Sequence, residues 1–133
     1  MLLTSISLWA DFSRDDTTQI VTDSNTGLEW QDDAIGSTMT WQSAIDYCEG
    51  LSLDGFEDWR LPNINELKTI VDRSKVNPAI VSGFDNVLSS YYWSSTTAKN
   101  YSNYARIVHF DDGYVDVSSK SNSLYVRCVR AGE

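Results

Sequence analysis

Four short segments in the C-terminal half of the chain are rich in aromatic and β-branched residues and are separated by turn-forming residues. They span residues 91–96, 104–110, 114–118 and 125–129. Such runs are typical of β-strands. Asp111, Asp112 and Gly113 between the second and third runs favour a tight hairpin, because glycine tolerates the positive φ angle that such a turn requires. The pattern predicts an antiparallel sheet for this half of the chain.

Two helical patterns precede these strands. From residue 41, apolar residues recur at the i, i+3, i+4 and i+7 spacing of an amphipathic helix, and Thr40 is placed to cap its first turn. A second helix is predicted after Pro62, where Asn63 and Glu66 have the spacing of a capping box. The apolar positions of the two helices are Trp41, Ala44, Ile45, Cys48 and Leu51, then Ile64, Leu67, Ile70 and Val71.

The N-terminal third is predicted to contain a β-hairpin, with strands at 17–22 and 28–31 joined by turn formers. Residues 1–10 are apolar, lack a basic residue and are too few to span a bilayer. This segment is either the remnant of a signal peptide or an edge strand. We therefore expect an N-terminal segment at 1–12 and one domain at 13–133, because 133 residues suit a single compact core.

The chain is acidic, with 10 Lys and Arg residues against 19 Asp and Glu residues and a formal charge of -9. Such a field repels nucleic acid and anionic lipid, so no nucleic-acid partner is expected. It also disfavours sulfated polysaccharides unless Lys and Arg cluster on one face. No segment approaches transmembrane length, and we expect no membrane insertion. Oligomeric state is left open.

The two cysteines lie far apart, and neither belongs to a CxxC motif or a Cys/His cluster of zinc-site spacing. No zinc site is therefore expected. Spacing alone leaves two alternatives. Cys48 and Cys128 form a long-range disulfide in an oxidising compartment, or both are buried free thiols in a cytosolic protein.

Several acidic residues are candidate ligands or catalysts. A calcium loop around Asp23, Asn25, Asp32 and Asp33 is disfavoured, because the EF-hand spacing fails and a turn explains the composition. A glycosidase needs two carboxyls across a cleft, but neighbouring residues on a strand point to opposite faces. We therefore expect solvated turns at the pairs Asp15/Asp16, Asp32/Asp33 and Asp111/Asp112.

The only histidine, His109, lies in an alternating strand pattern and is expected to be a surface or hydrogen-bonded strand residue. No catalytic residue, metal or cofactor is predicted, and we do not expect an enzyme. The tryptophans at 30, 41, 59 and 93 are expected in the core, with their indole N–H groups bonded internally. Arg60 is expected to be a structural hydrogen-bond donor, and Glu66 to cap its helix.

Seven groups of residues, taken in order along the chain, carry a resemblance to a known family. They are Val21-Thr22-Asp23, Thr26-Gly27-Leu28-Glu29-Trp30, Trp41 with Ala44 and Cys48, Asp58-Trp59-Arg60-Leu61-Pro62-Asn63 with Glu66-Leu67, Tyr92-Trp93-Ser94-Ser95-Thr96, Phe110 with Gly113, and Val126-Arg127-Cys128-Val129-Arg130. The chain resembles, over residues 17–131, the bacterial domains named for the C-terminal domain of the Legionella collagen-like protein Lcl. That family is catalogued as a domain of unknown function.

The resemblance implies an α+β domain of C-type-lectin-like fold, with two helices packed on a twisted antiparallel β-sheet. It also implies a structural disulfide between Cys48 and Cys128, because folds of this type tie the first helix to the last strand. Closing a loop of this length stabilises a domain by about 4 kcal/mol on the entropic model. A disulfide implies a secreted, periplasmic or cell-surface location. The structural motif residues that the resemblance brings forward are Trp59, Arg60, Pro62, Glu66 and Trp93.

The spacing from Arg60 and Pro62 to Glu66 also resembles the formylglycine-generating branch of this fold. Enzymes of that branch use two cysteines near the C-terminal end of the domain, where this chain has only Cys128. The departure argues against their oxidation chemistry. The lectin calcium signatures Glu-Pro-Asn, Gln-Pro-Asp and Trp-Asn-Asp are absent as well.

The loops between residues 97 and 123 are rich in Tyr, Ser and Asn, a composition that suits recognition loops. Turn chemistry alone would also favour Ser and Asn. The expected function is a non-catalytic recognition or adhesion module for a surface glycan or protein ligand. The alternatives are a structural accessory domain of a cell-envelope protein and a formylglycine-generating-like enzyme. The expected ligand-binding residues are Asn100, Tyr101, Asn103, Tyr104, Asp111, Asp112, Tyr114 and Asn122.

Overall fold

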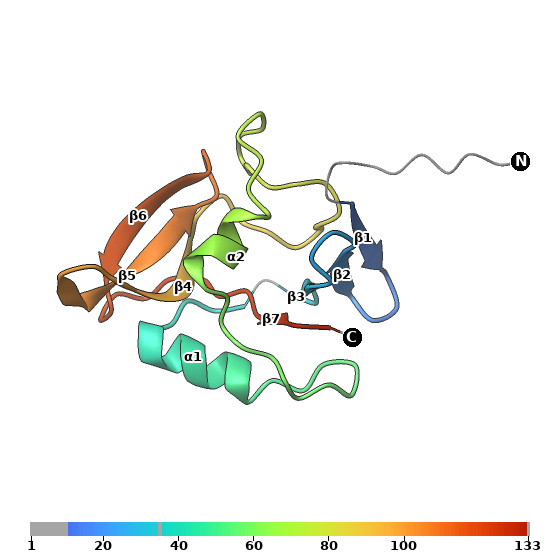
Figure 1. Cartoon of the computed structure of the whole chain (residues 1–133), viewed down its shortest axis with the longest axis horizontal. Coiled ribbons are helices and arrows are strands. Elements are labelled where there is room, and N and C mark those ends of the chain that lie inside the picture. Colours follow the sequence, from blue (N-terminus) through green and yellow to red (C-terminus); the bar gives the residue numbers. More distant parts are fainter. Residues whose placement is uncertain (1–10, 35, 133) are drawn as a thin grey trace, which may run out of the picture.

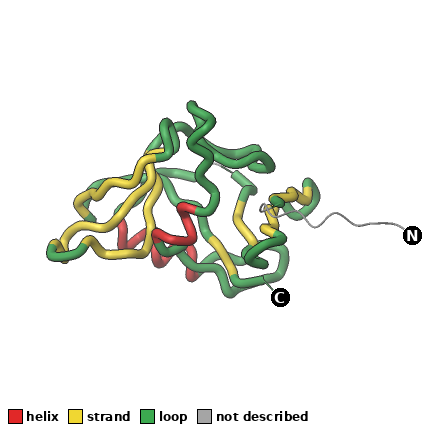
Figure 2. Tube along the Cα trace, turned by 45° about the horizontal axis from the view of Figure 1, so that its top comes forward, coloured by secondary structure: helices red, strands yellow, loops and turns green. Residues whose placement is uncertain are grey.

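The computed structural model describes residues 11–34 and 36–132, which form two antiparallel sheets and two helices (Figure 1). The three-stranded sheet lies at one end of the molecule and the four-stranded sheet at the other, with the helices alongside (Figure 2). This is an α+β architecture, as expected. The elements are β1 (Phe12–Asp15), β2 (Ile20–Asp23), β3 (Glu29–Gln31), α1 (Trp41–Glu49), α2 (Ile64–Lys68), β4 (Tyr91–Ala98), β5 (Tyr101–His109), β6 (Tyr114–Ser119) and β7 (Val129–Arg130).

The three-stranded sheet has the order β4-β5-β6, and both of its connections are antiparallel hairpins. This confirms the predicted sheet for three of its four runs. The fourth run, 125–129, was assigned wrongly: only Tyr125 bridges β4, in the parallel sense, whereas β7 joins the other sheet. The chain makes this switch because the backbone edge of β3 accepts Val129 and Arg130.

The four-stranded sheet has the order β1-β2-β3-β7. Strands β2 and β3 confirm the predicted N-terminal hairpin. Its turn is held by Asp23, whose carboxylate accepts hydrogen bonds from the Asn25 backbone N–H at 2.9 Å and from the Thr26 hydroxyl at 2.8 Å. The edge strand that the structure describes is β1, and the expectation for residues 1–10 lies outside the described residues.

Both predicted helices form. Their N-terminal caps agree with the sequence prediction to different degrees. The capping box of α2 is complete: the Asn63 side chain accepts from the Glu66 N–H at 2.8 Å, and the Glu66 carboxylate accepts from the Asn63 N–H at 3.0 Å. Thr40 is the N-cap residue of α1, as predicted, but its hydroxyl bonds the Ser43 hydroxyl and makes no side-chain cap to the backbone. Helix α2 also ends at Lys68, before the last expected apolar positions. No described helix is both long and apolar enough to cross a bilayer.

Two hydrophobic clusters form the core. One packs α2 against both sheets, and the other surrounds the Cys48–Cys128 disulfide, which ties α1 to the segment before β7 and confirms the expected pairing. Trp59 and Trp93 are buried in this second cluster, and their indole N–H groups donate to the backbone carbonyls of Phe56 and Met39.

The other two tryptophans depart in part from expectation. Trp41 is only half-buried, and its N–H donates to the Ser94 carbonyl at 2.9 Å. Trp30 is fully buried, but its indole nitrogen has no hydrogen-bond partner among the described residues. Apolar packing therefore places Trp30 in the core without an internal bond.

Candidate binding surface

The Arg60 side chain is a hydrogen-bond donor within the motif, as expected. The Arg60 guanidinium donates two hydrogen bonds to the Glu66 carboxylate, at 2.6 and 2.7 Å. These bonds lower the pKa of Glu66 from its ordinary value, although partial burial opposes the shift. Pro62 is fully buried, and its carbonyl accepts from the Ser95 N–H at 2.8 Å. The motif thus joins α2 to β4.

We expect this ion pair to make stability depend on acid pH. A carboxyl whose pKa is lowered in the folded state stabilises it above the unfolded pKa, and that contribution is lost as pH falls through the folded pKa. Because Arg60 and Glu66 are partly exposed, the contribution is no more than about 1 kcal/mol. The free energy of unfolding is measured by urea denaturation from about pH 6 to about pH 3. As pH falls, it should decrease less steeply in Arg60→Gln than in the parent or in Lys99→Gln. Equal slopes in all three would contradict this assignment.

Asp32 corrects the expectation that the carboxylate pairs are solvated turns. Its side chain is fully buried and lies 2.6 Å from Arg14 Nε and 3.0 Å from an Arg127 nitrogen. It also accepts hydrogen bonds from the backbone N–H groups of Asp85 and Asn86, at 2.8 and 3.1 Å. Asp32 is therefore a packing centre between β1, the end of β3 and the 84–87 loop.

Asp111 and Asp112 do lie in a turn, and Asp15 ends β1 directly before the turn that begins at Asp16. Asp15 is exposed and accepts from the Thr17 N–H at 2.8 Å, and Asp112 accepts from the Tyr114 N–H at 3.1 Å. His109 stacks on Tyr91 with ring centroids 4.1 Å apart. The described residues contain no group of three or more His, Cys, Asp or Glu side chains that could hold a metal ion.

All but one of the expected ligand-binding residues separate into two groups at opposite ends of the β5–β6 hairpin. Asn100, Tyr101, Asn103 and Tyr104 lie at or near the β4–β5 turn, at the end of the molecule remote from the C-terminus (Figure 1). Asp111, Asp112 and Tyr114 lie at the β5–β6 turn, because His109 pairs with Tyr114 and Tyr104 pairs with Ser119. Asn122 follows β6, where its side-chain amide donates to the Ser118 hydroxyl at 3.0 Å, and it belongs to neither group because it lines a different hollow together with Tyr91 and Asp116.

The first group contains an aromatic surface, which we call the tyrosine surface and define as Tyr101, Tyr104 and Val117. These side chains are 65%, 41% and 46% exposed, and they line a shallow hollow of about 240 Å³. The two tyrosine rings meet edge to face, with centroids 6.1 Å apart. Asn100 has a φ angle of 69° in the turn that directly precedes β5.

Polar groups border the tyrosine surface. Asn103, Ser119, Lys120 and Ser121 line a neighbouring hollow of about 460 Å³. Lys120 is held in place, since its ammonium lies 3.8 Å from the ring centroid of Trp41 and donates to Thr97 at 2.9 Å. Sequence reasoning missed Val117 and Lys120, although the alternation of Val115 and Val117 indicated one apolar face of β6.

Comparison with known proteins identifies the family of the chain. No curated protein matches the chain. A family model described as the Lcl C-terminal domain matches residues 19–130, which include both helices and strands β2 to β7. The chain belongs to the Lcl C-terminal domain family.

Proposed function

We propose that this domain is a non-catalytic recognition module that acts outside the cytoplasm and binds a carbohydrate or protein ligand through the tyrosine surface. The observation that carries the proposal is the exposed, edge-to-face pair of Tyr101 and Tyr104 beside Val117. Tyrosine supplies large contact area at low cost in conformational entropy. Its ring stacks on apolar faces while its hydroxyl bonds polar groups.

The scaffold supports such a role. The tyrosine surface stands on a hairpin whose strands pair over most of their length, so the rings are carried by a sheet rather than by a long loop. Bordering Asn and Ser side chains offer hydrogen bonds that would fix the orientation of a ligand. We further propose that the fold is C-type-lectin-like, which the two helices and the tie between the first helix and the C-terminal segment support.

The disulfide supports both the location and the non-catalytic assignment. Disulfides persist in oxidising compartments and are rare in the cytosol. Both cysteines of the chain are used in this bond, so neither supplies the free thiol that formylglycine-generating chemistry requires. A structural accessory domain of an envelope protein is the alternative, and it predicts no ligand for the tyrosine surface.

We expect the oxidised domain to bind a specific glycan or matrix protein on an array and Tyr101→Ala to weaken that binding by about tenfold or more. Stability should change by no more than about 0.5 kcal/mol, because the side chain is exposed. The array is probed with calcium and with a chelator, which decides whether binding requires the ion.

The matched control is Tyr114→Ala, which removes a similarly exposed tyrosine from the other end of the same sheet. Loss of binding in Tyr114→Ala but not in Tyr101→Ala would assign the ligand to the other end and overturn the proposed surface. Absence of any specific ligand under both conditions would favour the structural accessory domain.

A further inference from the structure

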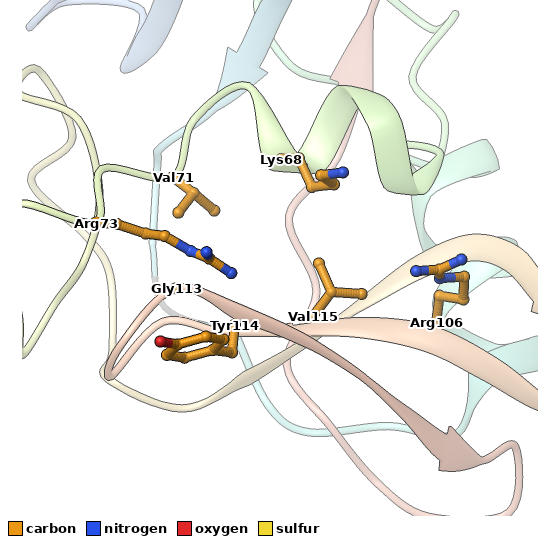
Figure 3. Close-up of a pocket in the computed structure, with 7 residues that line it drawn as sticks. All are labelled: Lys68, Val71, Arg73, Arg106, Gly113, Tyr114 and Val115. Carbon is orange, nitrogen blue, oxygen red and sulfur yellow. The ribbon is translucent and has the colours of Figure 1, made fainter.

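A cationic cleft lies on the molecule between α2, the segment that follows it, and the β5–β6 hairpin (Figure 3). Its volume is about 550 Å³. Lys68, Arg73 and Arg106 line it, and none of the other lining residues is acidic. We define the cationic cleft by these three side chains together with Val71, Tyr114 and Val115.

A glycine allows the fold to build this cleft. Gly113 has a φ angle of 87°, and a Cβ placed there would lie 2.7 Å from Val71 Cγ1 and 3.2 Å from Arg73 Cγ. Because only glycine leaves this space free, the hairpin turn lies directly against the segment after α2. That approach places residues from a helix, a loop and a strand around one cleft.

The charges in the cleft are uncompensated by the described part of the chain. The arginines at 14, 60, 127 and 130 form ion pairs with carboxylates. Lys68, Arg73 and Arg106 form none with the described residues. In a chain of net charge -9, three such cations around one hollow create a local field opposite to that of the whole molecule.

The cations are spread along the cleft rather than gathered at one point. Figure 3 shows Arg73 beside Tyr114 at one end, Arg106 at the other end, and Lys68 on α2 between them. The Arg73 guanidinium carbon lies 4.3 Å from the centroid of the Tyr114 ring, which orients it. Val115 supplies apolar wall between the ends, and Val71 lies beside Arg73.

We propose that the cationic cleft binds a small organic dicarboxylate whose two anionic groups are separated by an apolar spacer. Guanidinium groups recognise carboxylates through paired hydrogen bonds, so Arg73 and Arg106 each hold one end. The spacer contacts Val115, and Lys68 adds positive charge between the ends. Because the cations face solvent, binding weakens as salt screens the charges. This site shares no lining residue with the tyrosine surface, although Arg106 pairs with Val117 across β5 and β6, and it does not depend on the proposed function.

The test is a titration of the oxidised, isotope-labelled full chain, followed by amide chemical shifts. The probes are adipate, its monocarboxylate analogue hexanoate, and inorganic phosphate. We expect adipate to shift the amides of Lys68, Gly113 and Val115 at lower concentration than either of the other probes does. Equal binding of phosphate or hexanoate would overturn the two-ended site, and so would shifts confined to other parts of the chain.

Substitutions then identify which cationic side chains bind adipate. Arg106→Gln and Arg73→Gln should each weaken adipate binding by about tenfold, while Lys99→Gln, which removes a cation outside the cleft, should leave it unchanged. Tyr101→Ala should also leave it unchanged. If Lys99→Gln weakens binding as much as the two arginine variants do, the attraction is a general charge effect and the proposal fails. Native-like spectra of the unbound variants exclude unfolding as the cause of a loss.

Discussion

Replacing Asp32 by Asn is expected to lower the free energy of unfolding by about 3–5 kcal/mol. Asn keeps the shape of the side chain but removes its negative charge, which leaves the buried guanidinium of Arg127 without an anionic partner. The Arg127 Nε already lacks a hydrogen-bond partner within the described ranges, so the remaining groups have little spare capacity to compensate. Uncompensated buried charge is among the largest single-site penalties known.

The effect should extend beyond one contact, because Arg127 also donates to the carbonyls of Gln31 and Asn86 and lies over the Phe84 ring. Losing the central anion therefore loosens the 84–87 loop and the approach to β7 together. Urea denaturation followed by tryptophan fluorescence measures the loss.

Asp16→Asn is the matched control for this prediction. Asp16 bonds the same Arg14 at 2.6 Å, but its side chain is 87% exposed, so the expected loss is below about 1 kcal/mol. Denaturation midpoints that coincide for the two variants would contradict the central role of Asp32.

Removing the disulfide is expected to destabilise the domain by a similar amount. The Cys48→Ala/Cys128→Ala double variant should lose about 4 kcal/mol, because the bond closes a segment with a sequence separation of 80 residues and restricts the unfolded chain. Both cysteines are fully buried, so the double variant also loses a little packing. Replacing both residues avoids a free thiol that could cross-link molecules.

Chemical denaturation of the double variant and of the oxidised parent measures this difference, and the reduced parent serves as the control. The reduced parent should resemble the double variant, since both lack the covalent loop. If the double variant unfolds at the same urea concentration as the oxidised parent, the bond contributes nothing and the entropic argument fails for this chain.

Local patterns predicted the fold best. The capping box needs only Asn63 and Glu66, which lie within one turn, and the β5–β6 turn needs only Gly113 and its neighbours. The burial of Asp32 could not be read in the same way, because Arg127 is 95 residues away in the sequence. An acidic residue after a strand suggests a turn until its distant partners are known.

The binding residues illustrate the same limit. Composition identified Tyr101, Tyr104 and Tyr114 as candidate binding residues. It could not show that they lie at two different ends of the β5–β6 hairpin. Strand β5 has 9 residues, so the two turns that it joins lie roughly 26 Å apart. The cationic cleft was not predicted at all, because Lys68, Arg73 and Arg106 come from a helix, a loop and a strand that meet only in the folded chain.

The position of the disulfide has a mechanical consequence. Cys128 directly precedes β7, and Cys48 lies within α1. Tension applied to the chain on both sides of the domain therefore passes from Cys48 to Cys128 through the covalent bond. Residues 49–127, which include α2 and the whole three-stranded sheet, are shielded from the pull and cannot be extended by it. A ligand held by that sheet would stay bound to an intact surface even while force peels β1 and β7 from the opposite end.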